Sequence, residues 1–152
     1  MSNVSPIYPE GGTGEQMRDA IQVAIDSCNP DDNFILLVAA GDWTVASTTD
    51  PGDGTPYFAI TLKSGTPGHP ITYTFNGNIV AAAASYAGAE ASMIGADQKS
   101  YITINGSGSV DGSAMPDIGI EQGRMILHLG AASNITIDGS AGLRFLNARG
   151  GD

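Results

Sequence analysis

The sequence has 152 residues, and 16 Asp and Glu against 6 Lys and Arg give a formal net charge of −10 at pH 7. A nucleic-acid groove needs clustered basic side chains, and a membrane span needs about 20 consecutive apolar residues. The sequence has neither, so it predicts no nucleic-acid partner and no membrane partner. Its first residues also lack the basic and apolar segments of a secretory signal. The length fits one domain over residues 1–152, and the single cysteine, Cys28, excludes an internal disulfide.

One segment, residues 13–28, has the apolar spacing of an α-helix. Its apolar positions repeat every three or four residues, which places them on one face. Thr13 and Gln16 fit a capping box at its start, and Pro30 stops the pattern. The predicted helix is a lid on a β core, and Cys28 ends its apolar face as a small buried residue rather than a nucleophile.

The rest of the chain consists of short apolar segments separated by Gly, Pro, Asn, Asp and Ser. This pattern is typical of β-strands joined by turns. The segment 81–91 has few strand-forming residues, and we interpret it as a loop or a short helical turn. The predicted strands are residues 34–38, 43–45, 57–62, 71–75, 101–104, 125–129, 135–137 and 143–145.

An internal repeat indicates how these strands are arranged. Asn76, Asn105 and Asp138 each follow a strand and precede a glycine, and the two intervals between them are similar in length. Both intervals fall within the period of about 20 to 50 residues that is typical of stacked repeats. A parallel β-helix is favoured over the alternative, a two-sheet sandwich built from antiparallel hairpins.

Residues 14–26, 34–38 and 40–45, followed by 102–112 and 133–139, resemble the pectin-lyase-like superfamily of right-handed parallel β-helices. That superfamily includes pectate lyases, polygalacturonases and many phage tailspikes. The resemblance implies an all-β fold: a short right-handed parallel β-helix of about three to four coils over residues 34–146. It also implies that the helix at 13–28 caps the first coil. A shared fold does not by itself fix a function.

The residues for polysaccharide cleavage are not found in the expected pattern. Polygalacturonase-like members carry Asn-Thr-Asp, Asp-Asp, Gly-His-Gly and Arg-x-Lys motifs on successive coils. Here the only adjacent acids, Asp31 and Asp32, fall between the helix and the first strand, and His69 lies in a turn. His128 alternates with two leucines and is expected to face away from the core.

Lyase chemistry would instead need a basic residue beside calcium-binding acids. We interpret the available Asp and Arg residues as solvated groups at turns, and residues 50–54 as a Gly/Pro turn rather than a cation loop. The sequence therefore predicts no catalytic residues, no cofactor and no metal site. The lyase candidates weighed were Asp111, Asp117, Asp138, Arg124, Arg144 and Arg149.

Two functional hypotheses remain. In the first, the chain is a structural virion protein of a bacteriophage, a capsid decoration or cement protein. It would be a homotrimer on the capsid surface, bound to the major capsid protein or another virion protein. No second amphipathic helix covers the last coil, so Leu143, Phe145 and Leu146 are the predicted partner interface. In the second, the chain is the N-terminal part of a carbohydrate-binding or polysaccharide-degrading β-helix protein, a tailspike or a pectinase-like enzyme.

Overall fold

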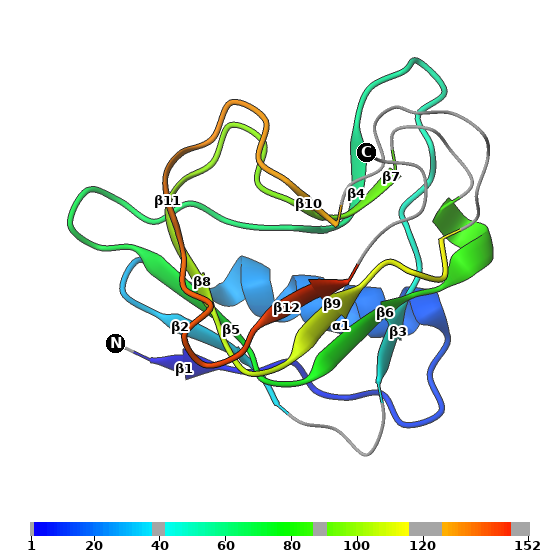
Figure 1. Cartoon of the computed structure of the whole chain (residues 1–152), viewed down its shortest axis with the longest axis horizontal. Helices are drawn as coiled ribbons and strands as arrows, with labels where there is room; N and C mark the ends of the chain where they lie inside the picture. Colours follow the sequence, from blue (N-terminus) through cyan, green and yellow to red (C-terminus); the bar gives the residue numbers. More distant parts are fainter. Residues whose placement is uncertain (1, 38–41, 87–90, 116–125, 147–152) are drawn as a thin grey trace.

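A computed structural model describes residues 2–37, 42–86, 91–115 and 126–146 (Figure 1). Helix α1 (Gly14–Ser27) is the predicted helix. The Thr13 hydroxyl accepts a hydrogen bond from the Gln16 backbone N–H at 3.2 Å, and the Gln16 side chain accepts one from the Thr13 N–H at 2.9 Å. This capping box satisfies two backbone donors that a helix start leaves free. The apolar face buries Ile21 and Ile25 completely, so the predicted lid on a β core is confirmed.

The strands pair in three sheets, and every ladder within these sheets is parallel. The sheet orders are β1-β2-β5-β8-β11, β10-β7-β4 and β12-β9-β6-β3. Parallel pairing contradicts the sandwich alternative, which needs antiparallel hairpins. The strands are β1 (Asn3–Val4), β2 (Asn33–Leu36), β3 (Trp43–Val45), β4 (Tyr57–Thr61), β5 (Ile71–Phe75), β6 (Asn78–Ala81), β7 (Ala91–Gly95), β8 (Ser100–Asn105), β9 (Ser109–Asp111), β10 (Leu127–His128), β11 (Ser133–Ile137) and β12 (Arg144–Leu146).

The expected all-β fold is confirmed in its coarser part only. The described residues form mostly strands in parallel sheets together with one α-helix, which is an α/β-like combination. Within the described ranges the three sheets are separate ladders and do not join into a closed solenoid.

The sequence repeat is present, but its register differs from the one that the Asn/Asp-Gly pairs suggest. Ile102 pairs with Ile71 on one side and with Ile135 on the other, so these three isoleucines occupy the same position of the structural repeat. Asn105 is therefore aligned with Thr74 and not with Asn76. The reason is that Asn76 follows Ile71 by five residues, whereas Asn105 follows the aligned Ile102 by three.

Aromatic and aliphatic side chains of neighbouring strands stack on one another in the core between the three sheets. The ring of Phe34 lies 5.9 Å from both the Tyr73 and the Phe75 rings, and all three residues are fully buried. The Tyr73 hydroxyl donates to the Lys63 carbonyl at 2.9 Å and accepts from the Lys63 N–H at 2.8 Å, so this buried polar group is satisfied. Burial raises the pKa of the Tyr73 hydroxyl, which keeps it neutral.

Glycine is required where adjacent segments approach most closely. A Cβ on Gly108 would lie 2.0 Å from the Gly77 carbonyl oxygen. Gly106 has a φ of +130°, and a Cβ there would lie 2.2 Å from the Phe75 carbonyl oxygen. These two glycines let the turn between β8 and β9 lie directly on the turn between β5 and β6.

Four strands, β1, β6, β7 and β9, are not among the predicted strands. All five residues of β7 are buried, and only Ala91 of this strand falls in the segment 81–91. The 3-10 helix Ala83–Tyr86 agrees with the interpretation of that segment as a short helical turn. Strand β1 adds two residues to the edge of β2. Predicted strand residues Val38 and Met125 lie outside the described ranges.

Candidate functional site

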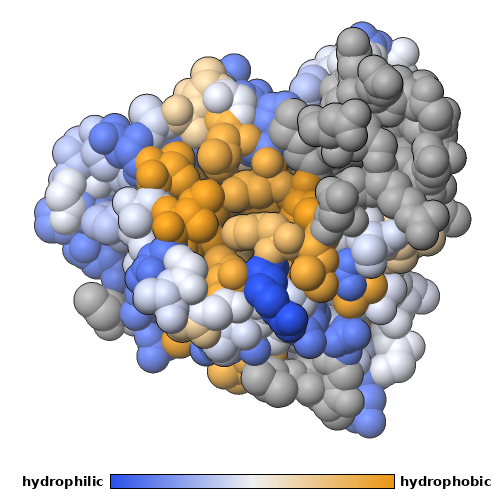
Figure 2. Space-filling model, viewed as in Figure 1, coloured by the Kyte–Doolittle hydropathy of each residue, from blue (hydrophilic) through white to orange (hydrophobic). Residues whose placement is uncertain are grey.

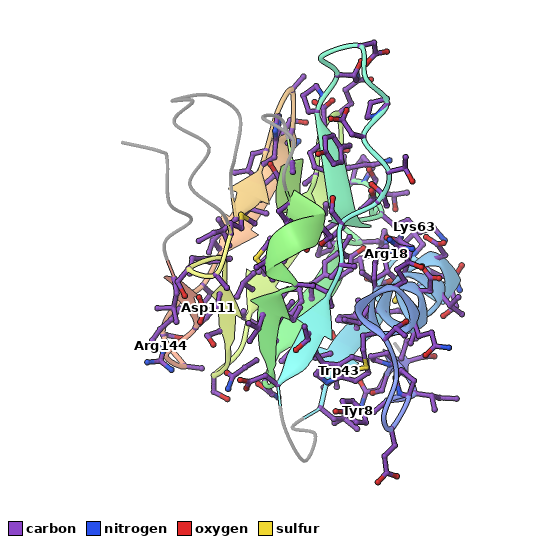
Figure 3. The ribbon with its side chains drawn as sticks, turned by 90° about the vertical axis from the view of Figure 1, so that its right-hand side faces the viewer. Tyr8, Arg18, Trp43, Lys63, Asp111 and Arg144 are labelled. Carbon is purple, nitrogen blue, oxygen red and sulfur yellow. The ribbon has the colours of Figure 1, made fainter. Side chains whose placement is uncertain are left out.

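Helix α1 covers one edge of all three sheets. It packs against β1, β3 and β4, and each of these strands is the end strand of a different sheet. Figure 3 shows this arrangement from the side, with α1 to the right of the strands. At this end, the buried face of α1 therefore covers the apolar side chains that lie between the sheets.

The opposite edges carry no comparable cover within the described residues. They are formed by β11, β10 and β12, all of which come from residues 127–146. Figure 3 places Arg144, from β12, on the side of the molecule away from α1. An edge strand without a neighbour leaves backbone N–H and C=O groups ready to pair with another chain segment.

Exposure changes sharply from the next-to-last strand to the last. Ile104 in β8 is 0% exposed, whereas its register partner Ile137 in β11 is 46% exposed. Val110 in β9 is 0% exposed, whereas its partner Phe145 in β12 is only half-buried. Side chains at the same position of the repeat thus differ in whether a further layer lies above them.

We call the apolar side chains at this end the open face. Figure 2 shows apolar side chains gathered in the middle of the surface on which β11 and β12 lie toward the viewer in Figure 1. The open face consists of partly buried or exposed side chains: Ile126, Leu127, Leu129, Ile135, Ile137, Leu143 and Phe145.

The predicted interface residues Leu143, Phe145 and Leu146 all lie at or beside β12. Leu143 and Phe145 pack partly against the core, and Leu146, which is half-buried, aligns with Asp111. The sequence prediction therefore found one of the three strands at this edge. Aligning the chain with itself so that Ile102 matches Ile135 is the signal that would have found the other two.

The sequence pattern also predicts Ile104, Val110, Ile135 and Ile137 inside the core, and the first two are fully buried there, whereas the last two are on the open face. Ile135 is half-buried, and Ile137 is classed with the exposed large apolar residues of the described chain. They align with the buried Ile102 and Ile104, but among the described residues no further strand pairs with β11 on its other side.

The two lyase-candidate carboxylates in the described residues, Asp111 and Asp138, are used by local turns. The Asp138 carboxylate accepts a hydrogen bond from the Ser140 N–H at 2.9 Å, and hydrogen bonds from Ser140 hold the pKa of Asp138 below its ordinary value. The Asp111 carboxylate accepts from the Ser113 N–H at 2.8 Å. A general acid in glycoside cleavage needs a raised pKa, so the environment of Asp138 is opposite to that requirement.

The Gly/Pro turn at residues 50–54 has the same character. The Asp50 carboxylate accepts from the Gly52 N–H at 2.8 Å, and the Asp53 carboxylate accepts from the Thr55 N–H at 2.9 Å. Hydrogen bonds from the Thr55 hydroxyl and N–H lower the pKa of Asp53. Within the described parts of the chain, no group of three His, Cys, Asp or Glu side chains is placed to hold a metal ion.

The two histidines lie in different places. His69 Nδ1 lies 2.8 Å from Asp31 Oδ2, and both side chains are largely exposed. The His128 ring lies 5.2 Å from the Phe58 ring, edge to face. The neighbouring Leu127 and Leu129 pack against the core, and His128 itself is half-buried beside Phe58, with its Nδ1 atom shielded from solvent.

Cys28 is fully buried at the end of α1. Burial raises the pKa of its thiol, and the nearby Asp32 carboxylate raises it further. A buried thiol with a raised pKa is a poor nucleophile, in agreement with its interpretation as a core residue.

A hollow of about 680 Å³ lies between α1 and the segment after β3. The Arg18 guanidinium donates to the Ser47 carbonyl at 2.6 Å and contacts Asp19 at 2.9 Å. The Ser47 N–H donates to the Ser85 hydroxyl at 2.9 Å. These bonds make the hollow a polar junction that fixes α1 to the strands.

Three of the lyase candidates, Asp117, Arg124 and Arg149, lie outside the described residues.

Comparisons with protein-family models, with curated proteins and with solved structures each found no match. In the described part of the chain, no helix combines the length and the apolar character that a membrane crossing requires.

Proposed function

We propose that the three sheets are the three sides of a short right-handed parallel β-helix. The sheet orders support this, because successive strands along the chain from β2 to β12 pass through the sheets in rotation. Each strand meets its neighbour in the sheet after one full circuit, which leads from Ile71 in β5 to Ile102 in β8 and then to Ile135 in β11. Helix α1 is then the cap of the first coil.

The proposed function is that of a structural assembly protein without catalytic activity. The observation that carries it is the contrast between the two ends: one is covered by α1, whereas at the other the described residues leave the apolar open face partly exposed. Each Å² of apolar area removed from water contributes about 25 cal/mol, so this face favours association with another surface. The open face is therefore the proposed assembly surface.

The resemblance to phage β-helices supplies the proposed setting. The chain would be a capsid decoration or cement protein, present as a homotrimer on the virion surface and bound to the major capsid protein. The net charge of −10 opposes non-specific aggregation, because like-charged subunits repel one another. In the proposed trimer, the apolar area buried at the open face outweighs this repulsion.

Light scattering and cosedimentation with phage capsids that lack the protein test this proposal. We expect a trimer that cosediments with the capsids, and Phe145→Asp should abolish cosedimentation because it places a charge in the buried contact. Leu37→Asp is the matched control, since Leu37 is an exposed leucine outside the open face. A monomer that ignores capsids, or equal loss in both variants, would refute the proposal.

A second candidate is the N-terminal part of a carbohydrate-binding or polysaccharide-degrading β-helix protein. The observation that favours it is the pairing of the last strands. β10, β11 and β12 each pair in parallel with the strand one repeat earlier, so one more coil of the same polypeptide could pair with them in the same way. A reading frame that continues past Asp152 with further coils would support this candidate. For the chain itself, incubation with polygalacturonate and host-surface glycans should release no reducing ends or unsaturated products.

A further inference from the structure

An apolar groove lies between α1 and residues 4–7 of the segment that precedes it. Its volume is about 380 Å³. Ala24, which is buried in α1, also lines it, and the only polar residues around it are Ser5, Asp19 and Ser27. The groove residues are Val4, Ser5, Pro6, Ile7, Asp19, Ala20, Val23, Ala24 and Ser27, and we call this set the α1 groove.

The α1 groove contains the two most exposed large apolar side chains of the described residues. Ile7 is 86% exposed and Val23 is 70% exposed. Val23 lies on the face of α1 opposite to the buried Ile21 and Ile25, because two positions along a helix correspond to about half a turn. Two such side chains in one groove form an apolar surface that is separate from the open face.

The helix surface around Val23 is acidic. Asp19 and Asp26 are both exposed, and they neighbour Val23 on the helix surface because they lie four residues before it and three residues after it. One nearby cation, Arg18, has a side chain only 16% exposed and is already paired with Asp19.

Lys63, the other nearby cation, bonds to backbone carbonyls and not to these carboxylates. Lys63 Nζ donates to the backbone carbonyls of Asp26 and Cys28, at 3.1 and 2.6 Å, at the end of α1. The α1 groove is therefore bordered by carboxylates along one edge, where Asp19 lines the groove and Asp26 lies beside Val23.

We propose that the α1 groove is a docking site for a segment of another protein that carries two or three aliphatic side chains flanked by Lys or Arg. The aliphatic side chains would lie against Ile7 and Val23, and the basic ones beside Asp19 and Asp26. A second copy of this chain fits poorly, because it brings the same charge of −10 and only 6 basic residues. The site is independent of the proposed assembly through the open face, which lies at the opposite edges of the sheets.

The test uses a fluorescent synthetic amphipathic peptide of Leu and Lys, and a matched peptide in which every Lys is Glu. Binding to the full chain is measured by fluorescence anisotropy at low and high salt. Variants Val23→Ser and Ile7→Ser remove the apolar contacts, and the double variant Asp19→Asn/Asp26→Asn removes the two charges. Leu37→Ser, another exposed aliphatic position, is the matched control. Thermal unfolding of each variant checks that the fold is retained.

We expect the Lys peptide to bind and the Glu peptide not to bind. Val23→Ser and Ile7→Ser should each weaken binding by about tenfold, as truncation of a central contact residue does. The double charge variant should weaken binding and reduce its salt dependence, and Leu37→Ser should leave it unchanged.

Three results would overturn the proposal. Equal binding of both peptides would show an unselective apolar surface, and binding unaffected by Val23→Ser would show unselective charge attraction. Self-association that disappears in Val23→Ser would identify a second copy as the occupant. Failure of capsid binding through Phe145 would leave this test unaffected, so the two proposals fail separately.

Discussion

Alanine variants of two paired residues, Ile104 in β8 and Ile137 in β11, test whether the open face is exposed to solvent. Ile104 and Ile137 are register partners in β8 and β11, and both continue the same inner row. Ile104 is completely buried, whereas nearly half of Ile137 is exposed. The variants Ile104→Ala and Ile137→Ala therefore remove the same atoms from two positions that differ in cover.

The structure sets the expected magnitudes. A fully buried Ile→Ala substitution loses the transfer free energy of the removed groups and leaves a cavity, at a cost of about 2–5 kcal/mol. Ile137 retains contact with water, so its truncation loses about half of the transfer free energy and creates no closed cavity. The expected cost for Ile137→Ala is about 1 kcal/mol.

Denaturant unfolding at low protein concentration provides the assay. The midpoint should fall much further for Ile104→Ala than for Ile137→Ala, while the slope of the transition stays constant in both. Equal losses that persist on dilution would refute the reasoning, because they would show that Ile137 is buried in the free chain. Equal losses only at high concentration would show that a second copy covers the open face.

Three further outcomes follow from the structure. Ile21→Asp should destabilise the chain by several kcal/mol, because it buries a carboxylate without a partner, whereas Val23→Asp on the exposed side of α1 should change the unfolding midpoint little. Hydrogen bonds from the Asn29 and Ser2 N–H groups lower the pKa of Asp32 in the folded chain. The Asp32 carboxylate therefore contributes to stability above the unfolded pKa of about 3.9, and this contribution is lost as the pH falls through the lower folded pKa. Asp32→Asn should therefore flatten the loss of stability on acidification, and an unchanged acid limb in urea titrations would contradict this. Cys28 should resist a thiol reagent in the native chain at pH 8 and react fully in denaturant, since burial raises its pKa; rapid native labelling would contradict its placement.

The sequence by itself determined the elements whose signals are local. Helix α1 begins after Thr13, as the capping box predicts, because both capping hydrogen bonds join Thr13 to Gln16 within a single turn. Strands β3 and β5 have the predicted bounds, since alternating apolar residues and flanking turn residues mark them within a few positions.

The strand β7 could not be predicted in the same way. Its residues, Ala91–Gly95, are all buried, so they show no alternation between apolar and polar side chains. Its neighbours are distant in sequence, since Ala91 pairs with Tyr57 of β4 and Ile94 pairs with Leu127 of β10. Burial on both sides depends on those distant strands, and a local window of sequence does not contain them.

Only the tertiary structure decided which apolar residues are covered. Ile104 and Ile137 occur in nearly identical sequence contexts, Ile-Thr-Ile-Asn-Gly and Ile-Thr-Ile-Asp-Gly, yet one is fully buried and the other is not. The local pattern determines that each side chain points inward from its strand. Whether a further layer removes it from water depends on the stacking of segments that lie a full repeat apart in the chain, and this is why the open face emerges only from the assembled sheets.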